Sequence, residues 1–394
     1  MNVRSRLSSP RVQLVAVLAT VAAVALFLIT VPTFRHFFDL GVYRGAVQYW
    51  LIDGGDLYDF RYQDTVYGFT YPPFAAMVLS PLALTSWPIA VGASIAINAG
   101  AVALVLRWHF VPTLRRLGWP IWTPCALAFC AIVVFEPARD SFSFGQLNLV
   151  LLALVCADLR ALPSRRWAGV GIGLAAAVKL TPAVFVGSLL LSRQHRAAAV
   201  AGGTAVGVTL LAAVVAPRAS RVFWTSAIWD TDRVGNLAYV SNQSLRGIVA
   251  RLDGPASWWI AAVAVVLVVW WIRTWRATDH LAGFALTGVV ACLISPVTWV
   301  HHLVWLLPAL FLMLDTSLAT VAPRRRRWQL VALAAVYVAL SSSVVWLWWA
   351  GAHGWLAVVG SNTYVWISFG LLLAVPVAAD TVPHRGRGQL RLDI

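Results

Sequence analysis

The chain repeatedly runs for about twenty residues without one charged side chain, the length of helix that crosses a bilayer. The first of these runs extends from Val12 to Val31. Hydrophobic residues make up 60% of the sequence and charged residues 11%. In soluble domains about a quarter of the residues are charged, so the low charged fraction of this chain excludes a soluble protein. We therefore expect an all-α, polytopic membrane protein.

The sequence leaves no room for a separate soluble domain. The longest stretches that are not strongly apolar cover residues 32–71 and 217–256. Both are shorter than most globular domains. We expect residues 1–394 to form a single integral membrane domain, with these two stretches as loops on the outer face. The first apolar run is too long for a cleavable signal peptide and is expected to remain as a span.

The distribution of positive charge predicts the orientation. The formal net charge is +15, and Lys179 is the only lysine, so nearly all of this charge is arginine. Arginines flank the apolar runs, as they do in cytoplasmic loops, and this pattern argues against a nucleic-acid-binding protein. If every cluster is cytoplasmic, both termini are cytoplasmic as well. The clusters are Arg4/Arg6/Arg11, Arg107/Arg115/Arg116, Arg160/Arg165/Arg166, Arg193/Arg196, Arg273/Arg276, Arg324–Arg327 and Arg385/Arg387/Arg391.

Two segments do not fit a simple span. Residues 72–84 are too short and are expected to form an interfacial or re-entrant helix. Residues 168–192 are interrupted at Pro182, which predicts two short helices in place of one crossing. With these segments the sequence predicts about twelve helices. The other spans are expected at 12–31, 87–106, 120–136, 145–161, 197–216, 257–275, 281–297, 301–315, 328–346 and 363–380.

Unusual polar residues fall on the outer side of this topology. Asp39 lies just beyond the first span among apolar residues, where a carboxylate is costly unless it has a partner or a function. Alternatively, it is a solvated helix cap. Polar groups that converge within an apolar surrounding indicate a binding site. The other candidates are Tyr43, Arg44, Tyr71, Glu136, Arg139, Gln146, Asn148, Lys179, Asn242, Gln243, Arg246, His301 and His302.

Several of these residues also have a structural interpretation. Glu136, the only glutamate, can form an ion pair with Arg139 that fixes the end of a span. Lys179 can extend to the membrane surface. The four cysteines lie in apolar segments without metal-ligand spacing, and two adjacent histidines point in different directions, so we expect no metal and no cofactor. The carboxylates of Asp230 and Asp232 are the alternative cation ligands.

The order of these motifs resembles glycosyltransferase family 87, whose members are GT-C-type membrane enzymes of actinobacteria. The resemblance covers residues 35–310 and is nearest to α-(1→2)-mannosyltransferases that use polyprenyl-phosphate-mannose. It does not name the acceptor. The motifs are Asp39-Leu40…Tyr43, Phe69-Thr70-Tyr71-Pro72-Pro73-Phe74, Glu136-Pro137…Arg139…Gly145-Gln146…Asn148, Lys179-Leu180-Thr181-Pro182, Asn242-Gln243-Ser244…Arg246-Gly247 and Ser295-Pro296…Trp299…His301-His302.

The resemblance implies an inverting transfer of mannose from a polyprenyl-phosphate-mannose donor to a hydroxyl of a mannosylated lipid or glycan, with an α-1,2 linkage, at the outer face of the plasma membrane. It implies that Asp39 is the base that deprotonates this hydroxyl. Cationic and hydrogen-bonding groups must stabilise the leaving phosphate. The candidates for the phosphate are Lys179, Arg246, His301 and His302. The candidates for sugar and acceptor are Tyr43, Arg44, Tyr71, Glu136, Arg139, Gln146, Asn148, Asn242 and Gln243.

Other functions remain open from the sequence. The family also contains arabinofuranosyltransferases, so a polyprenyl-phosphate-arabinose donor is one alternative. A secondary transporter with about twelve spans is another, because broken helices and an intramembrane lysine are typical of transporters. We find no repeat that relates the two halves of the chain, and the polar residues gather on one side only. Both observations favour an enzyme over a transporter or a non-catalytic scaffold.

Overall fold

The computed structural model describes residues 9–31, 33–63, 65–164, 166–349 and 354–377. Throughout these ranges the regular structure is helical and no strand occurs, which confirms the all-α class. The helices that contain or flank residues 32–71 and 217–256 are α2 (Pro10–Thr30), α3 (Phe38–Leu51), α4 (Pro73–Leu79), α12 (His195–Val215), α13 (Pro217–Val222), α14 (Leu245–Arg251) and α15 (Ala256–Trp275). The remaining α-helices are α5 (Trp87–His109), α6 (Val111–Arg116), α7 (Trp122–Val134), α8 (Glu136–Phe144), α9 (Asn148–Ala161), α10 (Val170–Val178), α11 (Val184–Leu191), α16 (His280–Ile294), α17 (Leu307–Ala319), α18 (Pro323–Ser341), α19 (Trp355–Ser361) and α20 (Thr363–Ala374).

Within the described residues, five helices are long and apolar enough to cross a membrane, and up to seven if each sharply bent pair counts as one span. The five are Pro10–Thr30, Trp87–Arg116, His195–Val215, Ala256–Trp275 and Val300–Ala319. Shorter apolar helices occupy several of the other predicted spans, among them Trp122–Val134 and His280–Ile294. A multi-pass membrane protein is thereby confirmed, whereas the count of about twelve helices stays a prediction.

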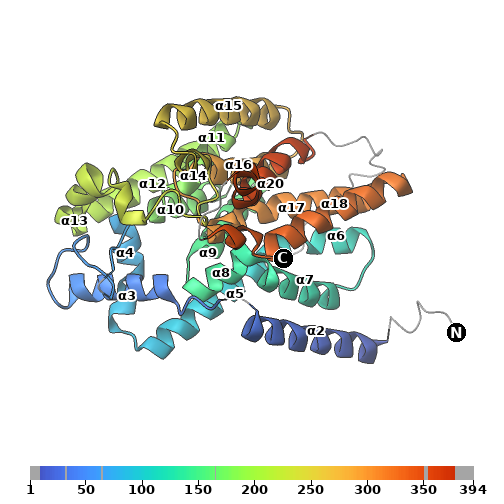
Figure 1. The fold of residues 1–394 in the computed structure, drawn as a ribbon, viewed down its shortest axis with the longest axis horizontal. Coiled ribbons are helices and arrows are strands. Elements are labelled where there is room, and N and C mark those ends of the chain that lie inside the picture. Colours follow the sequence, from blue (N-terminus) through green and yellow to red (C-terminus); the bar gives the residue numbers. More distant parts are fainter. Residues whose placement is uncertain (1–8, 32, 64, 165, 350–353, 378–394) are drawn as a thin grey trace.

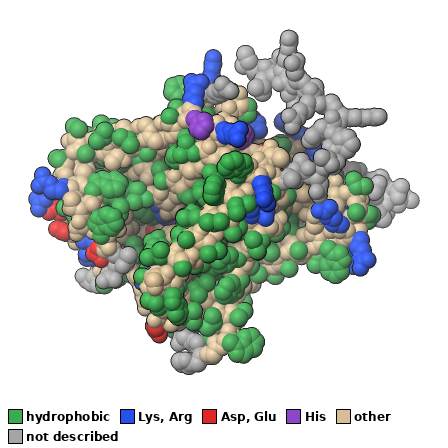
Figure 2. Space-filling view, turned by 90° about the horizontal axis from the view of Figure 1, so that it is seen from above, with side chains coloured by type: hydrophobic (Ala, Val, Ile, Leu, Met, Phe, Trp, Pro, Cys, Tyr) green, Lys and Arg blue, Asp and Glu red, His purple; other side chains and the backbone are tan. Residues whose placement is uncertain are grey.

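Helix α16 lies at the centre of the fold (Figure 1), where every side chain from Ala282 to Leu293 is buried. It packs against α15, α17, α20 and α11. Helices α10 and α12 approach one another closely because small residues line their contact. Gly173 is one of these, and a Cβ atom there would collide with the backbone and side chains of α12. The outer surface differs from that of a soluble protein: Figure 2 shows hydrophobic side chains over most of one face, and Leu84 and Val214 are 86% and 79% exposed.

Helix breaks supply the positions from which the functional candidates project. Helices α8 and α9 meet at an angle of 117°, and Gly145 adopts a left-handed conformation at the bend. The spans predicted at 120–136 and 145–161 leave residues 137–144 between them, and in the structure this segment belongs to helix α8. The predicted break near Pro182 is present: α10 ends at Val178, and a 3₁₀ turn (Thr181–Ala183) leads into α11.

The two predicted outer-face loops are partly helical and contact one another. Residues 32–71 contain α3, and residues 217–256 contain α13, a π-helical turn (Phe223–Ala227), a 3₁₀ turn (Thr231–Val234) and α14. Arg218 forms an ion pair of 2.5 Å with Asp56, and the guanidinium of Arg233 donates to the carbonyl of Tyr58 at 2.7 Å. Of the acidic residues in this region, Asp64 lies outside the described residues. Arg4, Arg6, Arg165, Arg385, Arg387 and Arg391 of the basic clusters also lie outside them.

Candidate active site

Asp39 lies in the first turn of α3 and is partly buried. The start of α3 is tied to the end of α8, because the backbone N–H of Phe37 donates to the carbonyl of Ser143 at 2.8 Å. One carboxylate oxygen of Asp39 accepts a hydrogen bond of 2.6 Å from the side-chain amide of Gln146. Burial raises the pKa of Asp39 to about 6, while the bond from Gln146 and the charge of Lys179 act to lower it. A carboxylate with such a pKa is suited to accept a proton near neutral pH.

Lys179 occupies the break between α10 and α11, where the chain is extended. Its Nζ atom donates to Oδ1 of Asn148 at 3.0 Å and lies 2.8 Å from Nε2 of His302. The other ring nitrogen of His302, Nδ1, accepts the backbone N–H of Trp299 at 3.1 Å. This bond fixes the orientation of the imidazole and turns Nε2 towards Lys179.

Buried side chains connect Asp39 with Lys179. The hydroxyl of Tyr71 donates to Oε1 of Gln146 at 3.1 Å, and Nζ of Lys179 lies 3.4 Å from the same hydroxyl. Tyr43 and Tyr71 share a hydrogen bond of 2.9 Å between their hydroxyls. The amide of Asn148 donates to Gln146 and to the carbonyl of His301 at 3.4 and 3.3 Å. Residues from five separate segments thus form one continuous hydrogen-bonded network.

The members of this network differ in exposure. Tyr43, Tyr71, Gln146 and Asn148 are buried, whereas Asp39, Lys179 and His302 are only partly buried. The buried residues are therefore positioned to hold the others in place, and the three groups with acid–base or cationic chemistry are the more exposed members. The sequence placed all seven residues among its candidates. Their roles stay predictions.

A second polar cluster adjoins this network and includes Arg35, which the sequence analysis missed. The guanidinium carbon of Arg35 lies 4.6 Å from the ring centre of Trp346 and 5.5 Å from that of Phe144. It also forms a long ion pair of 3.8 Å with Asp140. His301 is buried against Phe144, and its Nε2 atom has no hydrogen-bond partner among the described residues. A signal for Arg35 does exist in the sequence, because it is an arginine beyond the first span, on the side where arginines are scarce.

Three of the predicted sugar-binding residues have structural partners, and their contact with sugar stays a prediction. Arg44 donates to the carbonyl of Thr85 at 3.0 and 2.9 Å and to Gln48 at 3.0 Å. The carboxylate of Glu136 accepts from Nε1 of Trp346 at 2.6 Å and from the hydroxyl of Tyr364. Arg139 donates to Ser343 at 2.7 Å and to the carbonyl of Val134 at 3.0 Å, and it forms no ion pair with Glu136. The Glu136–Arg139 ion pair, which was the structural alternative, is therefore not formed, and both side chains contact neighbouring helices instead.

Asn242 and Gln243 also bind protein backbone rather than facing a cavity. The amide group of Asn242 contacts the carbonyls of Leu237 and Pro296 and the N–H of Thr298, at 3.0, 3.2 and 2.9 Å. Gln243 contacts Val240, Ser361 and Tyr364 in the same way. Both side chains are fully buried. They fix the loop before His301, and the predicted contact with sugar finds no support in this geometry.

The remaining candidates are Arg246 and the two aspartates, Asp230 and Asp232, that were the alternative cation ligands. Arg246 is partly buried, and its NH1 atom has no described hydrogen-bond partner, so its role towards a phosphate stays a prediction. In the described part of the chain, no group of three or more His, Cys, Asp or Glu side chains could hold a metal ion. Asp230 accepts from Nε of Arg233 at 3.0 Å. The side chain of Asp232 lies outside the described atoms, so the absence of a metal remains an expectation.

Known proteins resemble the chain over most of its length. The relatives include polyprenol-phosphate-mannose-dependent alpha-(1-2)-phosphatidylinositol mannoside mannosyltransferases of Mycolicibacterium smegmatis, 34% identical over 88% of this chain and 85% of the relative, and of Mycobacterium tuberculosis, 31% identical over 92% and 91%. A polyprenol-phosphate-mannose-dependent alpha-(1-2)-phosphatidylinositol pentamannoside mannosyltransferase of Mycolicibacterium smegmatis is 33% identical over 92% of this chain and 91% of the relative.

No solved structure matches the chain, so the GT-C type of fold that the resemblance implies stays a prediction. The family itself is clear. The sequence profile of glycosyltransferase family 87 matches residues 69–296, which include Tyr71, Gln146, Asn148 and Lys179 of the network. Together with the relatives, which match over most of their length, this match confirms the resemblance and disfavours the transporter and scaffold alternatives. The chain belongs to glycosyltransferase family 87.

Proposed function

We propose that the protein transfers mannose from a polyprenyl-phosphate-mannose donor to a hydroxyl of a mannosylated lipid, forming an α-1,2 linkage with inversion. The names of three relatives support this donor, this linkage and an acceptor of the phosphatidylinositol mannoside class. None of these names favours arabinose. The observation that carries the proposal is the network in which Asp39, a carboxylate with a pKa of about 6, is joined through Gln146 and Tyr71 to Lys179 and His302.

Asp39 is the proposed base. An inverting transfer forms the bond between C1 of mannose and the acceptor oxygen on the face opposite to the breaking bond between C1 and the phosphate oxygen. The acceptor proton passes to the Asp39 carboxylate, and the electron pair of the broken bond leaves with the phosphate. Gln146 orients the carboxylate by its 2.6 Å hydrogen bond. This positioning is the contribution that a fixed base makes to the rate.

Lys179, His302 and His301 are the proposed partners of the leaving phosphate. A phosphate gains negative charge as the bond to C1 breaks, and cationic or N–H donors aimed at it stabilise that charge. The break between α10 and α11 and the 3₁₀ helix Val300–Leu306 place these side chains together. His301 brings a nitrogen without a hydrogen-bond partner among the described residues, and Arg35, which contacts Phe144 as His301 does, adds a second cation. No metal ion is required by this arrangement.

One helix supports the proposed membrane orientation. Val300–Ala319 is long and apolar enough to span the membrane, with His301 and His302 at its first turn. Just beyond its other end, Arg324–Arg327 begin α18. Basic clusters of this kind lie on the cytoplasmic side. We therefore propose that the site faces the outside of the plasma membrane, that about twelve helices or half-helices cross or enter the membrane, and that both termini are cytoplasmic.

The donor also needs a place for its polyprenyl chain. A pocket of about 320 Å³ lies among α5, α7, α17 and α18, and except for Tyr337 its lining is aliphatic or Phe. Phe135, next to α8, and Leu307, the first residue of α17, line it, so it adjoins the helices that carry the site. An isoprenoid chain fits such a lining because it has no polar group to satisfy. We propose this pocket for the part of the donor nearest the phosphate.

Transfer of radiolabelled mannose tests the function. The purified protein in lipid is given polyprenyl-phosphate-[¹⁴C]mannose and a panel of phosphatidylinositol mannosides. We expect label in the lipid product with the wild type and with Asp53→Asn, which changes an exposed aspartate just beyond the end of α3, and loss of label with Asp39→Asn. Transfer by Asp39→Asn at the wild-type rate would remove Asp39 as the base. Transfer only from polyprenyl-phosphate-arabinose would replace mannose as the donor sugar.

A further inference from the structure

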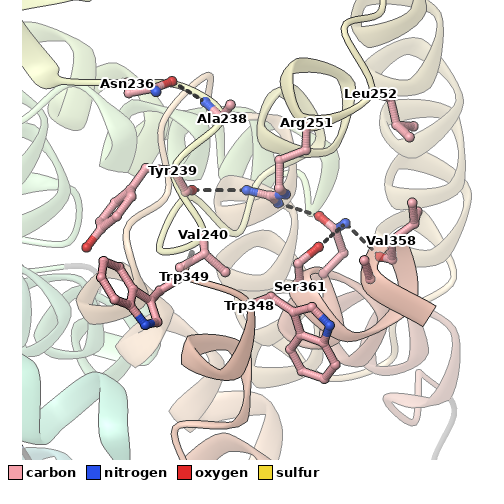
Figure 3. Close-up of a pocket in the computed structure, with 12 residues that line it drawn as sticks. Asn236, Ala238, Tyr239, Val240, Arg251, Leu252, Trp348, Trp349, Val358 and Ser361 are labelled. Carbon is pink, nitrogen blue, oxygen red and sulfur yellow. Dashed lines mark hydrogen bonds between the residues drawn. The ribbon is translucent and has the colours of Figure 1, made fainter. Parts of the chain in front are cut away.

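A second pocket, outside the Asp39 network, opens between the loop before α14 on one side and Trp348, Trp349 and helix α19 (Trp355–Ser361) on the other. Its volume is about 250 Å³, enough for about one sugar ring. Its lining includes Tyr239, Trp348, Trp349, Asn236, Arg251 and Asn362 (Figure 3). None of the residues that form it was a candidate in the sequence, and none takes part in the network around Asp39.

The polar side of this pocket is built around Arg251. Its guanidinium donates to the carbonyls of Tyr239 and Asn242, each at 3.0 Å, and to the side chain of Asn362, as Figure 3 shows in part. These bonds hold the guanidinium rigidly, yet its buried Nε atom has no described hydrogen-bond partner. A buried donor without a partner is costly and is commonly satisfied by a ligand or water. The carbonyl oxygen of Asn236's side chain accepts from the N–H of Ala238 at 2.9 Å, and its amide nitrogen donates to no described residue.

The other side of the pocket is aromatic. Trp348 packs over Gly360, where any side chain would collide with the indole, so a glycine is needed at this position. Trp349 is 69% exposed and Tyr239 is 43% exposed, although both line the pocket. Tryptophan at a membrane boundary often serves only as an interfacial anchor. Here aromatic rings line the same pocket as amide and guanidinium groups, and that combination suits a ligand with one apolar face and a rim of hydroxyls.

The lining selects a neutral saccharide over a lipid chain. An acyl or isoprenoid chain would leave Arg251, Asn236 and Asn362 facing hydrocarbon, which is unfavourable. The apolar pocket among α7, α17 and α18 has no such groups and is the better match for a lipid. A pyranose ring can stack its C–H face on an indole while its hydroxyls bond to amide and guanidinium groups.

The pocket adjoins the candidate active site without overlapping it. The ring of Tyr239 lies 5.8 Å from that of Trp346 and 6.3 Å from that of Trp299. Trp346 stacks with Arg35, and the backbone of Trp299 holds His302. Asn242 and Gln243 bind Thr298 from the same loop. One loop thus borders the pocket on one side and the phosphate-facing residues on the other.

We propose that this pocket is a saccharide subsite that binds a sugar unit of the acceptor other than the one that reacts. The proposal rests on the proposed function for the identity of the acceptor. It follows that an acceptor with several sugar units binds better than one with a single sugar, because only the larger one reaches the pocket. The reacting hydroxyl then lies at Asp39 while a more distant sugar stacks on Trp349.

Kinetics of Trp349→Ala test this proposal, with Trp355→Ala as the matched control. Trp355 is 72% exposed, close to the 69% of Trp349, but it does not line the pocket. We expect Trp349→Ala to raise KM for a multiply mannosylated acceptor by about tenfold, while kcat, the donor KM and the KM for a single-mannose acceptor stay unchanged. Equal kinetics of the two variants on every acceptor would overturn the subsite.

A binding measurement keeps this test independent of turnover. Trp349→Cys is labelled with a maleimide in the presence and absence of a soluble oligomannoside, with the wild type as the background for the native cysteines, which are buried or half-buried. We expect the oligomannoside to slow labelling of Trp349→Cys and not of Trp355→Cys. Protection without any mannosyl transfer would support the subsite and count against the proposed function. Mannosyl transfer without protection of Trp349→Cys would support the proposed function and count against the subsite.

Discussion

The side-chain amide of Gln146 donates to the carboxylate of Asp39 across 2.6 Å, although 107 residues separate them in the chain. The bend at Gly145 makes this contact possible. Gly145 has a φ angle of 72°, and its Cα faces Leu40, the residue after Asp39, so closely that a Cβ atom would lie 2.6 Å from that side chain. The catalytic candidate and the residue that orients it are therefore held by one tight contact between α3 and the α8–α9 bend.

The hydrogen bond from Gln146 predicts the effect of Gln146→Leu on pH dependence. An N–H that donates to a carboxylate stabilises the ionised form and lowers its pKa. Its removal should shift the acidic limb of the kcat/KM profile upwards by about one pH unit and reduce kcat. The profile is measured between pH 5 and 8.5 with Gln48→Leu as the control. Gln48 lies on α3, as Asp39 does, but its side chain contacts Arg44. If the acidic limb stays at the wild-type pH while kcat falls, Gln146 does not act through the pKa of Asp39.

The raised pKa of Asp39 predicts opposite effects of Asp39→Asn on activity and stability. Burial raises this pKa from 3.8 to about 6, so the folded state binds the proton more tightly than the unfolded state. The ionised carboxylate therefore reduces stability as pH rises from about 4 to about 6, and the loss persists above that range. Asparagine removes this penalty, and we expect Asp39→Asn to be more stable at pH 7.5 by up to about 3 kcal/mol while transfer falls at least about a hundredfold.

Thermal unfolding of the two proteins in the same detergent, at pH 5 and pH 7.5, measures this effect. The gain in Tm should be larger at the higher pH, because only there is the wild-type carboxylate fully ionised. A gain that is equal at both pH values would show that the charge of Asp39 carries no penalty in the folded state.

The sequence predicts the parts of this fold that depend on apolar length and on helix breakers. The break at Pro182 and the central position of Lys179 follow from one proline and one cation within an apolar run, because both have few permitted surroundings in a membrane. Helix α8 was not predicted. The segment Glu136–Phe144 is short and contains several polar residues, so its own sequence favours a helix only weakly. It is helical because it packs on the 3₁₀ helix Val300–Leu306.

The candidate site divides in a similar way. Isolated polar residues beside a helix break, such as Asp39, Gln146 and Lys179, meet in the structure because such residues must find polar partners. Glu136, Arg139, Asn242 and Gln243 have the same residue types and a similar setting in the sequence, yet they hold the backbone and neighbouring helices. Local sequence does not distinguish these two uses of a buried polar group, since the difference lies in which distant segment packs against it.

Lys179→Met should weaken binding of the donor more than that of the acceptor. Methionine keeps the length and the packing of the side chain and removes its three donors. Loss of a hydrogen bond to a charged phosphate corresponds to roughly a 10- to 100-fold rise in the donor KM. The acceptor KM should change little. Arg218→Met is the control, because it removes an exposed cation of α13 that is not part of the network. A rise confined to the acceptor KM would place Lys179 against the acceptor.

Asn242→Ala and Gln243→Ala test whether these residues are structural. Each amide contacts three backbone groups in a fully buried setting, and its loss leaves those groups unpaired. We expect each variant to lose about 1–3 kcal/mol of stability, and the exposed Asn236→Ala to lose much less. Thermal unfolding measures this loss. An unaltered Tm with a raised KM for either substrate would restore their predicted contact with sugar.

The orientation of the protein can be tested by the accessibility of single cysteines. If the Asp39 network faces outwards, Asp53 and Arg218 are outside and Arg325 is inside, since Val300–Ala319 separates the site from the start of α18. All three positions are exposed, unlike Asn242, so a cysteine at each can react without unfolding. A membrane-impermeant maleimide added to intact cells should label Asp53→Cys and Arg218→Cys but label Arg325→Cys only after permeabilisation. The native cysteines set the background, and the reverse pattern would place the site in the cytoplasm, where the donor and the acceptor would have to be presented on the inner leaflet.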